Sequence, residues 1–169
     1  MFAAMPLLVG LVIGQRLAEL WLARRNTRTL LARGGVEVGA GHYPFFIILQ
    51  SAWLLSIALL IPPFAPPNLI LLGVFLLLQI GRIWVISTLG PFWTTRIITL
   101  PGAPLVKTGP FKYVRHPNYL VVAGEIAVLP LIFYKEPKAI EIALVFSALS
   151  ALLTLWRIRV EERALAERR

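Results

Sequence analysis

The segment KTGPFKYVRHPNY, residues 107–119, gathers cationic and aromatic side chains directly before an apolar stretch. Proline is favoured as the first residue of a helix and pushes the residue before it toward extended geometry, so we predict a helix that begins at Pro117. The free N–H groups and the positive dipole end of this helix would form a site for an anion. The side chains expected around this site are those of Tyr113, Arg115, His116 and Tyr119.

The C-terminal sequence RIRVEERAL supplies charge of the opposite sign. Glu161 and Glu162 are the only adjacent carboxylates in the chain, and Arg157 lies four residues before Glu161, on the same face of a helix. A cationic helix start that faces two carboxylates suits a small ligand with one anionic and one cationic end. An amino-acid-bearing cofactor and a phospholipid head group both fit this description. The two acids can equally belong to a solvated, cross-paired helix.

These residues are embedded in a chain that has the composition of a membrane protein. Of its 169 residues, 58% are hydrophobic and 15% are charged, whereas a soluble domain is about half apolar with about a quarter of its residues charged. The length favours one compact unit. We therefore expect an all-α, polytopic membrane helix bundle that forms a single domain over residues 1–169.

Apolar stretches predict about five transmembrane spans, at residues 2–23, 43–61, 68–88, 118–134 and 140–156. A membrane helix needs about 20 residues, so the first three stretches are long enough. The last two are short and fit a helical hairpin joined at Lys135–Lys138. The prolines of IPPFAPPN separate the second span from the third, because proline ends helices. The cofactor region is expected at residues 90–119 together with 157–169.

The distribution of cations predicts the orientation in the membrane. The first loop, the third loop and the C-terminal tail are rich in Arg and Lys, whereas IPPFAPPN has no cation and Lys135 and Lys138 are offset by Glu136 and Glu141. The N-terminus is therefore expected outside and the C-terminus in the cytoplasm. Because the net charge of +9 follows this topology, we expect membrane lipids as partners and no nucleic acid.

Ionisable residues inside the spans are unusual, because each costs ~2.5–3.5 kcal/mol on insertion scales. Arg16 and Glu19 are three residues apart and can pair with each other. Gln79 and Arg82 are one turn apart, and Glu125 lies about two turns into the fourth span, with Arg82 or Arg16 as its expected partner. Structural pairing is one interpretation. The other is a pocket, open to the cytoplasmic side, in which Arg82 and Glu125 contact a substrate.

Several other kinds of site are not supported by the sequence. The chain has no cysteine and hence no thiolate metal site or catalytic thiol. His42 and His116 are far apart and outside any H-E-x-x-H motif, so we predict no metal. Dinucleotide, P-loop and G-x-S-x-G motifs are absent from the sequence. Trp84, Trp93 and Trp156 are expected in an interfacial aromatic belt rather than against a cofactor.

GPFKYVRHPNY, followed some forty residues later by RIRVEERAL, resembles the isoprenylcysteine carboxyl methyltransferase family, and the resemblance extends roughly from Gly90 to Leu165. The N-terminal sequences GQRLAELWLARRN and GGVEVGAGHYP resemble the bacterial branch that O-methylates alkylpyrones and alkylresorcinols. Tyr119 is followed by Leu-Val instead of the glycine that is frequent in the family, which favours this branch over the prenylcysteine one.

The resemblance implies an integral membrane methyltransferase that uses S-adenosylmethionine, with S-adenosylhomocysteine as the product, and has no Rossmann domain. Carried over by position, it implies a cofactor pocket lined by Tyr113, His116, Pro117 and Tyr119, with Glu161 and Glu162 contributed from the tail. It also implies that Arg157 faces the methyl acceptor. Together with the charge pattern, this makes Arg157 and Glu161 the candidate catalytic residues and adds Arg115 to the cofactor site.

The predicted function is O-methyl transfer to a lipophilic acceptor, such as an alkylpyrone or a phenolic lipid, at the cytoplasmic face of a bacterial plasma membrane. An ionised acceptor oxygen would need only orientation by Arg157, whereas a phenol would need a base, for which His116 and Glu161 are the candidates. The alkyl tail of the acceptor would enter from the bilayer between spans. The alternatives are a prenylcysteine-type carboxyl methyltransferase and a non-enzymatic module that binds anionic lipids.

Overall fold

A computed structural model describes residues 3–39, 41, 43–103 and 106–166. The helices in this part of the chain are α1 (Ala4–Ala32), α2 (Tyr43–Leu60), α3 (Leu69–Leu89), α4 (Pro117–Leu131) and α5 (Pro137–Ala166). Two short strands, β1 (Val36–Val38) and β2 (Ile97–Thr99), and two 3-10 turns, η2 (Gly90–Phe92) and η3 (Gly109–Lys112), lie between them.

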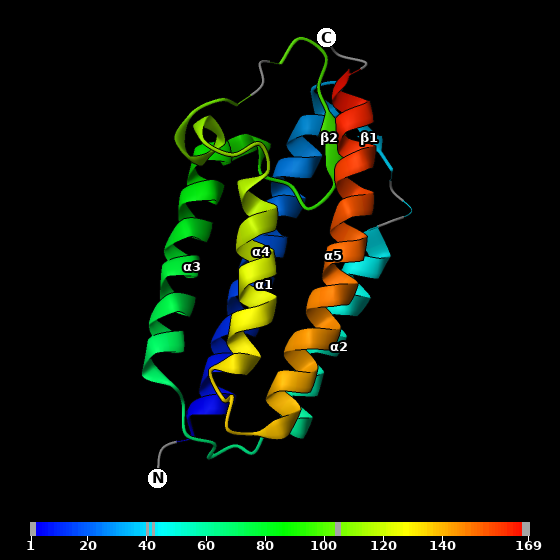
Figure 1. Ribbon diagram of the computed structural model, residues 1–169. Coiled ribbons are helices and arrows are strands. Elements are labelled where there is room, and N and C mark those ends of the chain that lie inside the picture. Colours follow the sequence, from blue (N-terminus) through cyan, green and yellow to red (C-terminus); the bar gives the residue numbers. More distant parts are fainter. Residues whose placement is uncertain (1–2, 40, 42, 104–105, 167–169) are drawn as a thin grey trace.

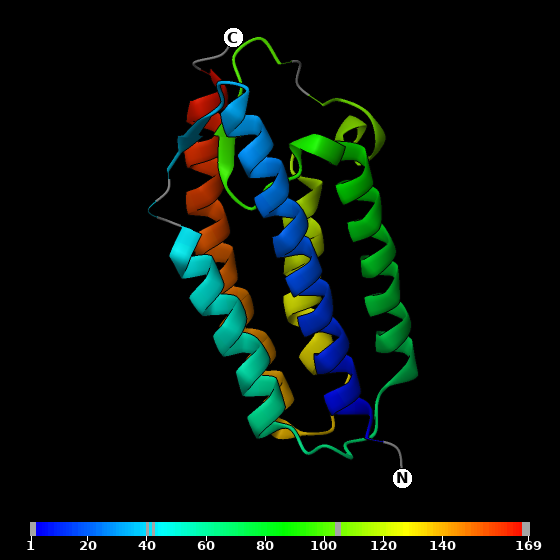
Figure 2. The same ribbon diagram turned by 180° about the vertical axis from the view of Figure 1, so that it is seen from behind.

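The five helices form an elongated bundle of two layers (Figure 1). Helix α4 packs between α3 and α5, and α1 and α2 lie side by side behind these three helices, as the opposite view shows (Figure 2). The core between the layers contains Val9 and Val12 of α1, Trp53 and Ile57 of α2, and Ile126 and Leu129 of α4, among others. All six side chains are buried, so the two layers are held together by apolar packing.

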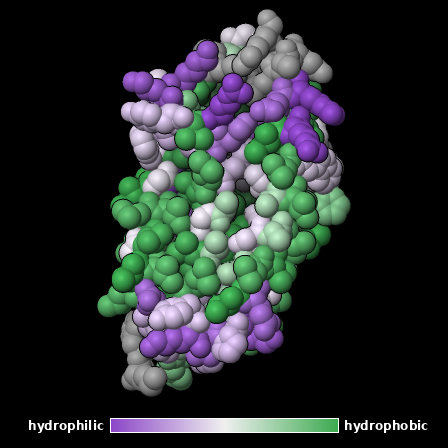
Figure 3. Space-filling model, viewed as in Figure 1, coloured by the Kyte–Doolittle hydropathy of each residue, from purple (hydrophilic) through white to green (hydrophobic). Residues whose placement is uncertain are grey.

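Four of the helices, α1, α2, α3 and α5, are long and apolar enough to cross a membrane. Large apolar side chains cover their outer surface, such as Leu59, Ile70 and Leu77, which are 72%, 79% and 67% exposed. Figure 3 shows this apolar surface as a band across the middle of the face in view, with hydrophilic residues at both ends. An apolar band of this kind is the surface that a bilayer covers, and the all-α membrane bundle expected from the sequence is confirmed.

Several helices extend beyond the predicted spans. Helix α1 continues to Ala32, beyond the predicted end at residue 23. Helix α5 runs without a break from Pro137 to Ala166, so the fifth span is not short, and its described tail is a continuation of the same helix. Helix α4 has 15 residues, a length of about 22 Å, which is less than a bilayer core of about 30 Å. It packs between the longer helices α3 and α5, which reduces its contact with lipid.

Helices α1, α3 and α5 end at one end of the bundle, and α2 and α4 begin there. We call this the basic end. Exposed cations of the last turns of α1 and of the first and third loops gather at it, among them Arg28, Arg33, Lys107 and Arg115. The strands β1 and β2 pair in antiparallel register there, with Val36 opposite Thr99, a small sheet that the sequence did not predict. The sheet ties the first loop to the third and packs against α5.

Both Gly-Pro dipeptides of the third loop begin 3-10 turns. Gly90 and Gly109 have φ values of +48° and +55°, a region that glycine adopts readily and other residues do not. The turn η3 returns to the end of α3, where a Cβ on Gly109 would lie 2.6 Å from Thr88 Oγ1. The loop is therefore folded back onto the bundle directly before α4 begins.

Candidate functional site

A cavity of about 480 Å³ lies between the two layers and extends from the basic end into the bundle. Tyr43 and Ala58 both line it, and they are 15 residues apart in α2, a distance of about 22 Å along the helix. Its apolar part is formed mainly by α1 and α2, with Val9, Ile13 and Leu54 among the lining residues. Its polar part, at the basic end, is lined by Arg16, Arg82, Trp93, Asn118, Tyr119 and Arg157.

The beginning of α4 and the last turns of α5 are joined by a hydrogen-bonded cluster. The Tyr119 hydroxyl donates to Glu161 Oε2 over 2.5 Å and accepts from Arg157 Nε over 2.9 Å. The Arg157 guanidinium also lies 5.4 Å from the centre of the Phe46 ring and 5.8 Å from that of Tyr119. Arg157, the predicted acceptor-facing residue, thus lines the cavity and is fixed by contacts with two other helices.

His116 and Glu162 form the outer part of this cluster. The His116 ring is stacked on Tyr119 with 5.4 Å between ring centres, and its Nε2 lies 3.6 Å from Glu162 Oε1. Pro117 is buried as the first residue of α4, as predicted. No side chain caps this helix. Pro117 has no N–H, and the Tyr119 N–H donates to His116 O over 3.1 Å, so the N–H of Asn118 is the one that the helix start offers to an anion. Glu161 contacts Tyr119 and Glu162 contacts His116, so both tail glutamates face the start of α4.

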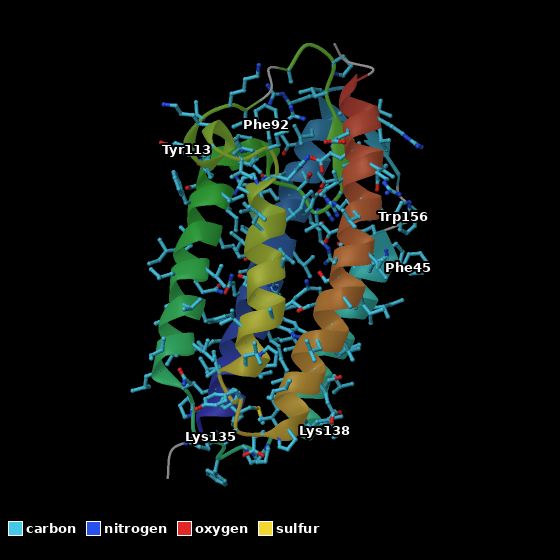
Figure 4. The ribbon with its side chains drawn as sticks, in the orientation of Figure 1. Phe45, Phe92, Tyr113, Lys135, Lys138 and Trp156 are labelled. Atoms are coloured by element: carbon cyan, nitrogen blue, oxygen red, sulfur yellow. The ribbon has the colours of Figure 1, made fainter. Side chains whose placement is uncertain are left out.

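Tyr113 and Arg115 lie outside this cluster. Tyr113 is 75% exposed, and Figure 4 shows it at the outer edge of the basic end, on the α3 side and away from α5. Arg115 is exposed as well, and neither residue lines the cavity. The structure brings together His116, Pro117, Tyr119, Arg157, Glu161 and Glu162 but not these two, so the predicted role of Tyr113 and Arg115 in cofactor binding has no counterpart in the observed contacts.

Two arginines and two glutamates form a buried ionic network beneath the polar end of the cavity. Arg82 Nη2 donates to Glu19 Oε2 over 2.6 Å and Nη1 to Glu125 Oε2 over 3.1 Å. Arg16 bridges the same two carboxylates, at 3.1 Å from Glu19 and 2.6 Å from Glu125. Gln79 donates to the second oxygen of Glu125 over 2.9 Å. The four charges cancel, and α1, α3 and α4 are joined through them.

Both pairings expected from the sequence are confirmed: Arg16 with Glu19, and Glu125 with Arg82 and Arg16. The expectation that Glu125 itself contacts a substrate is not matched by its position. Its side chain is 1% exposed, and it does not line the cavity, whereas Arg82, Arg16 and Glu19 do. Glu125 therefore acts on the cavity wall through the two arginines.

Trp93 is a site residue that the sequence led us to misplace. It is 3% exposed, lines the cavity and has its ring centre 5.9 Å from the Arg82 guanidinium. The expectation of an interfacial position is therefore wrong for Trp93, whereas Trp84 and Trp156 are 49% and 44% exposed. Figure 4 shows Trp156 beside Phe45 on the outside of α5 and α2, with ring centres 6.0 Å apart.

Asn26 holds Trp93 in place and carried no signal in the sequence. Its Nδ2 donates to the carbonyl oxygen of Gly90 over 3.0 Å and to that of Trp93 over 2.8 Å. The residue is buried in α1, 64 residues before Gly90. A single amide thus connects the first helix to the turn that brings Trp93 into the cavity.

We expect Asn26→Asp to destabilise the protein by about 2–4 kcal/mol, because a carboxylate cannot donate to two carbonyl oxygens and would be buried without a partner. Thermal unfolding in detergent would measure the loss. Thr29→Ala on the same helix is the control, since the Thr29 hydroxyl bonds only to Arg25 O at an exposed position and its loss should change stability by less than about 0.5 kcal/mol. Equal melting temperatures for the two variants would contradict the role of Asn26.

The apolar part of the cavity reaches the lipid-facing surface between α1 and α2. Four of its lining residues are exposed there: Ile13 and Leu17 of α1, at 43% and 62%, and Ile47 and Leu55 of α2, at 45% and 58%. An alkyl chain lying against them would be in contact with both the cavity and the bilayer. Among the described residues, no group of three or more His, Cys, Asp or Glu side chains is arranged to hold a metal ion.

Comparisons with known proteins identify the family of the chain. Residues 70–167 match the model of the isoprenylcysteine carboxyl methyltransferase family. The chain is 39% identical over 165 residues to a Bacillus subtilis protein named uncharacterized protein YpbQ, covering 95% of this chain and 96% of that protein. It is 26% identical over 160 residues to an uncharacterized protein of Haemophilus influenzae, covering 92% and 91% of the two chains.

No solved structure matches the chain significantly. The family match covers more than half of the sequence and contains the start of α4, the hairpin of α4 and α5, and the two tail glutamates. The chain is therefore an integral membrane protein that belongs to the isoprenylcysteine carboxyl methyltransferase family, a family of membrane methyltransferases.

Proposed function

We propose that the protein transfers a methyl group from S-adenosylmethionine to an oxygen atom of a lipophilic acceptor. The observation that carries the proposal is the cavity itself. Its polar end is bounded by Arg157 and Tyr119, which join α4 to Glu161 of the tail, and its apolar part opens between α1 and α2 toward lipid. A site with these two ends suits a substrate with a polar head and an alkyl chain.

The residues at the start of α4 fit S-adenosylmethionine by their chemistry. Its amino-acid part carries one carboxylate and one ammonium group, which match the uncapped helix start at Pro117 and the carboxylates of Glu161 and Glu162. The stacked rings of His116 and Tyr119 offer a flat surface for the adenine. When bound, S-adenosylmethionine supplies an electrophilic methyl group on a positively charged sulfur.

We assign to Arg157 the role of orienting the acceptor. Its guanidinium is fixed by the Tyr119 hydroxyl and by the rings of Phe46 and Tyr119, so a hydrogen bond to an acceptor oxygen costs little further loss of side-chain freedom. An oxygen that is already ionised needs no base. For a phenol, Glu161 or His116 would accept the proton. The contact between Arg157 and Tyr119 is partly buried, and burial strengthens electrostatic interactions relative to those in bulk water.

The acceptor is proposed to enter from the bilayer and the cofactor from the basic end. The cations of that end favour a cytoplasmic location by the positive-inside rule, and the similarity to two bacterial proteins favours the plasma membrane. The alkyl chain would lie along α2 from the level of Phe46 toward Ala58, both of which line the cavity. An alkylpyrone or phenolic lipid is the proposed acceptor class, and the family name keeps a prenylcysteine as the second candidate.

Radiolabel transfer tests the proposal. Purified protein in detergent would be given methyl-labelled S-adenosylmethionine with an alkylresorcinol, an alkylpyrone or a prenylcysteine, and the lipid extract counted. We expect label in the first two. Label in the prenylcysteine alone would mean that the acceptor is a prenylcysteine and not an alkylpyrone or phenolic lipid, because the methyl group would then be on a carboxylate. No label with any acceptor, together with vesicle binding that falls steeply with salt, would favour the non-enzymatic lipid-binding alternative.

The proposed position of the alkyl chain makes a prediction for Ala58. A phenylalanine at this position would fill the end of the cavity farthest from Arg157, so Ala58→Phe should shift the preference toward shorter acceptor chains. The measurement is kcat/KM for a series of alkylresorcinols of increasing chain length. Leu59→Phe is the control, because Leu59 is the next residue, is 72% exposed and does not line the cavity. A length preference unchanged by Ala58→Phe would contradict this position of the chain.

A further inference from the structure

Four residues that line the cavity have a buried polar atom without a hydrogen-bond partner among the described residues: Arg16, whose Nε belongs to the ionic network, and Gln50, Trp93 and Asn118. The amide oxygens of Gln50 and Asn118 and Nε1 of Trp93 are buried and make no hydrogen bond within the described residues. The three residues come from separate parts of the chain: α2, the loop after η2, and the start of α4. None of them was singled out as a site residue by the sequence.

An unpartnered buried polar group costs about 1–3 kcal/mol, and native proteins contain few of them. Apolar residues of similar shape would avoid the cost: leucine for Gln50 and phenylalanine for Trp93. The side chain of Trp93 is almost fully buried, at 3% exposed. The gathering of three such groups around one cavity is therefore explained by a ligand that satisfies them. Trp53 Nε1, Gln79 Oε1 and Ser147 Oγ are also unpartnered, but they do not line the cavity. Arg16 does line it, but its guanidinium already donates to Glu19 and Glu125.

The three groups lie around the polar end of the cavity, where an acceptor head would be held. Gln50 is four residues after Phe46 and hence on the same face of α2, and the Phe46 ring contacts Arg157. Asn118 directly precedes Tyr119, whose hydroxyl accepts a hydrogen bond from Arg157. Trp93 packs against Arg82 on the other side. Because Phe46 contacts Arg157 and Gln50 is one helical turn beyond Phe46, Gln50 lies about one turn farther into the cavity than Arg157.

The chemistry of the groups indicates what they bind. The indole N–H only donates, so Trp93 needs an acceptor oxygen on the ligand, whereas the two amide oxygens need hydroxyl or N–H donors. An alkyl chain satisfies none of them. We propose that Gln50, Trp93 and Asn118 form the recognition site for the acceptor head and select heads that carry a second oxygen function beside the one that receives the methyl group. This inference rests on the proposed function for the identity of the ligand as a methyl acceptor.

Equilibrium binding without S-adenosylmethionine tests the inference. The probes are an alkylresorcinol, with two hydroxyl groups, and the meta-alkylphenol with the same alkyl chain and only one. Binding of each to the purified protein would be titrated in the same detergent. We expect the alkylresorcinol to bind about tenfold more tightly, the effect of one to two satisfied hydrogen bonds. In Gln50→Leu and in Trp93→Phe the ratio should fall to about threefold or less, because each variant removes one partner.

Two controls separate recognition from structure. Trp84→Phe makes the same chemical change at a tryptophan that is 49% exposed and outside the cavity, so it should keep the tenfold ratio. Gln50→Leu removes an unpartnered amide, so its melting temperature should be unchanged or higher, whereas a residue with a structural role would lower it.

Equal binding of the two probes to the unmodified protein would overturn the inference. Retention of the full ratio in both Gln50→Leu and Trp93→Phe would overturn it as well. Failure of the proposed function is a different result. If no acceptor is methylated but the alkylresorcinol is still preferred and Gln50→Leu removes the preference, the head-recognition site stands and the methyl transfer does not.

Discussion

Arg157→Ala is expected to lower the rate of methyl transfer by ~10²–10³-fold, the usual effect of removing one preorganised hydrogen-bond donor from an active site. The guanidinium lines the cavity and is the group fixed by both Tyr119 and Phe46. The proposed cofactor residues His116, Glu161 and Glu162 stay in place. Binding of S-adenosylmethionine, measured by calorimetry, should therefore change little while kcat falls.

Arg159→Ala is the matched control for this variant. Arg159 is two residues farther along α5 and exposed, so its side chain is on a different face of the helix. The Arg159→Ala variant should transfer the methyl group at the normal rate. Arg157→Lys would show whether charge alone is sufficient, because lysine keeps the cation but loses the planar fork. If Arg157→Ala lost cofactor binding together with activity, the residue would belong to the cofactor site and its assignment to the acceptor would be wrong.

Arg82→Leu is expected to have the largest effect on stability, a loss of about 3–5 kcal/mol. The substitution leaves the carboxylates of Glu19 and Glu125 with one arginine between them, in a part of the bundle where Glu125 is 1% exposed. Removing one partner of a buried ionic network costs more than the network contributes as a whole, because the remaining charge has lost its compensation. Thermal unfolding of the purified variant in detergent would measure the effect.

Arg96→Ala and a second-site change serve as controls. Arg96 also pairs with a glutamate, Glu37, over 2.9 Å, but its side chain is 44% exposed, so its removal should cost less than about 1 kcal/mol. Adding Glu19→Gln to Arg82→Leu removes the excess negative charge and should restore part of the stability. An Arg82→Leu protein as stable as the Arg96→Ala one would show that the four charges do not act as a network.

Much of the membrane architecture could be predicted from the sequence, because it depends on local patterns. The apolar stretches and the prolines around Asn68 and Pro117 determine where helices α3 and α4 begin. The pairing of Arg16 with Glu19 follows from helical spacing, and partners for Glu125 follow from the cost of an unpaired charge in a bilayer. The opposed charges of the α4 start and the tail also pointed to a contact that the structure contains.

Helix limits were predicted less well where hydropathy and helix formation diverge. Arg24 and Arg25 end the apolar stretch but not α1, which continues to Ala32, because arginine is a good helix former. For the same reason Arg157 and Arg159 do not interrupt α5. Hydropathy marks the part of a helix that is in lipid, while the helix itself extends into the water on the basic side.

The sequence alone thus determined the membrane bundle, its ionic pairs and the charged residues at the start of α4, since each follows from short-range spacing or from the cost of charge in lipid. Only the tertiary structure decided that Gln50, Trp93 and Asn118 line one cavity and that Asn26 holds the loop of Trp93. These contacts join residues far apart in the chain, and nothing in the local pattern of a Gln in an apolar stretch or a Trp in a loop distinguishes a cavity wall from an exposed surface.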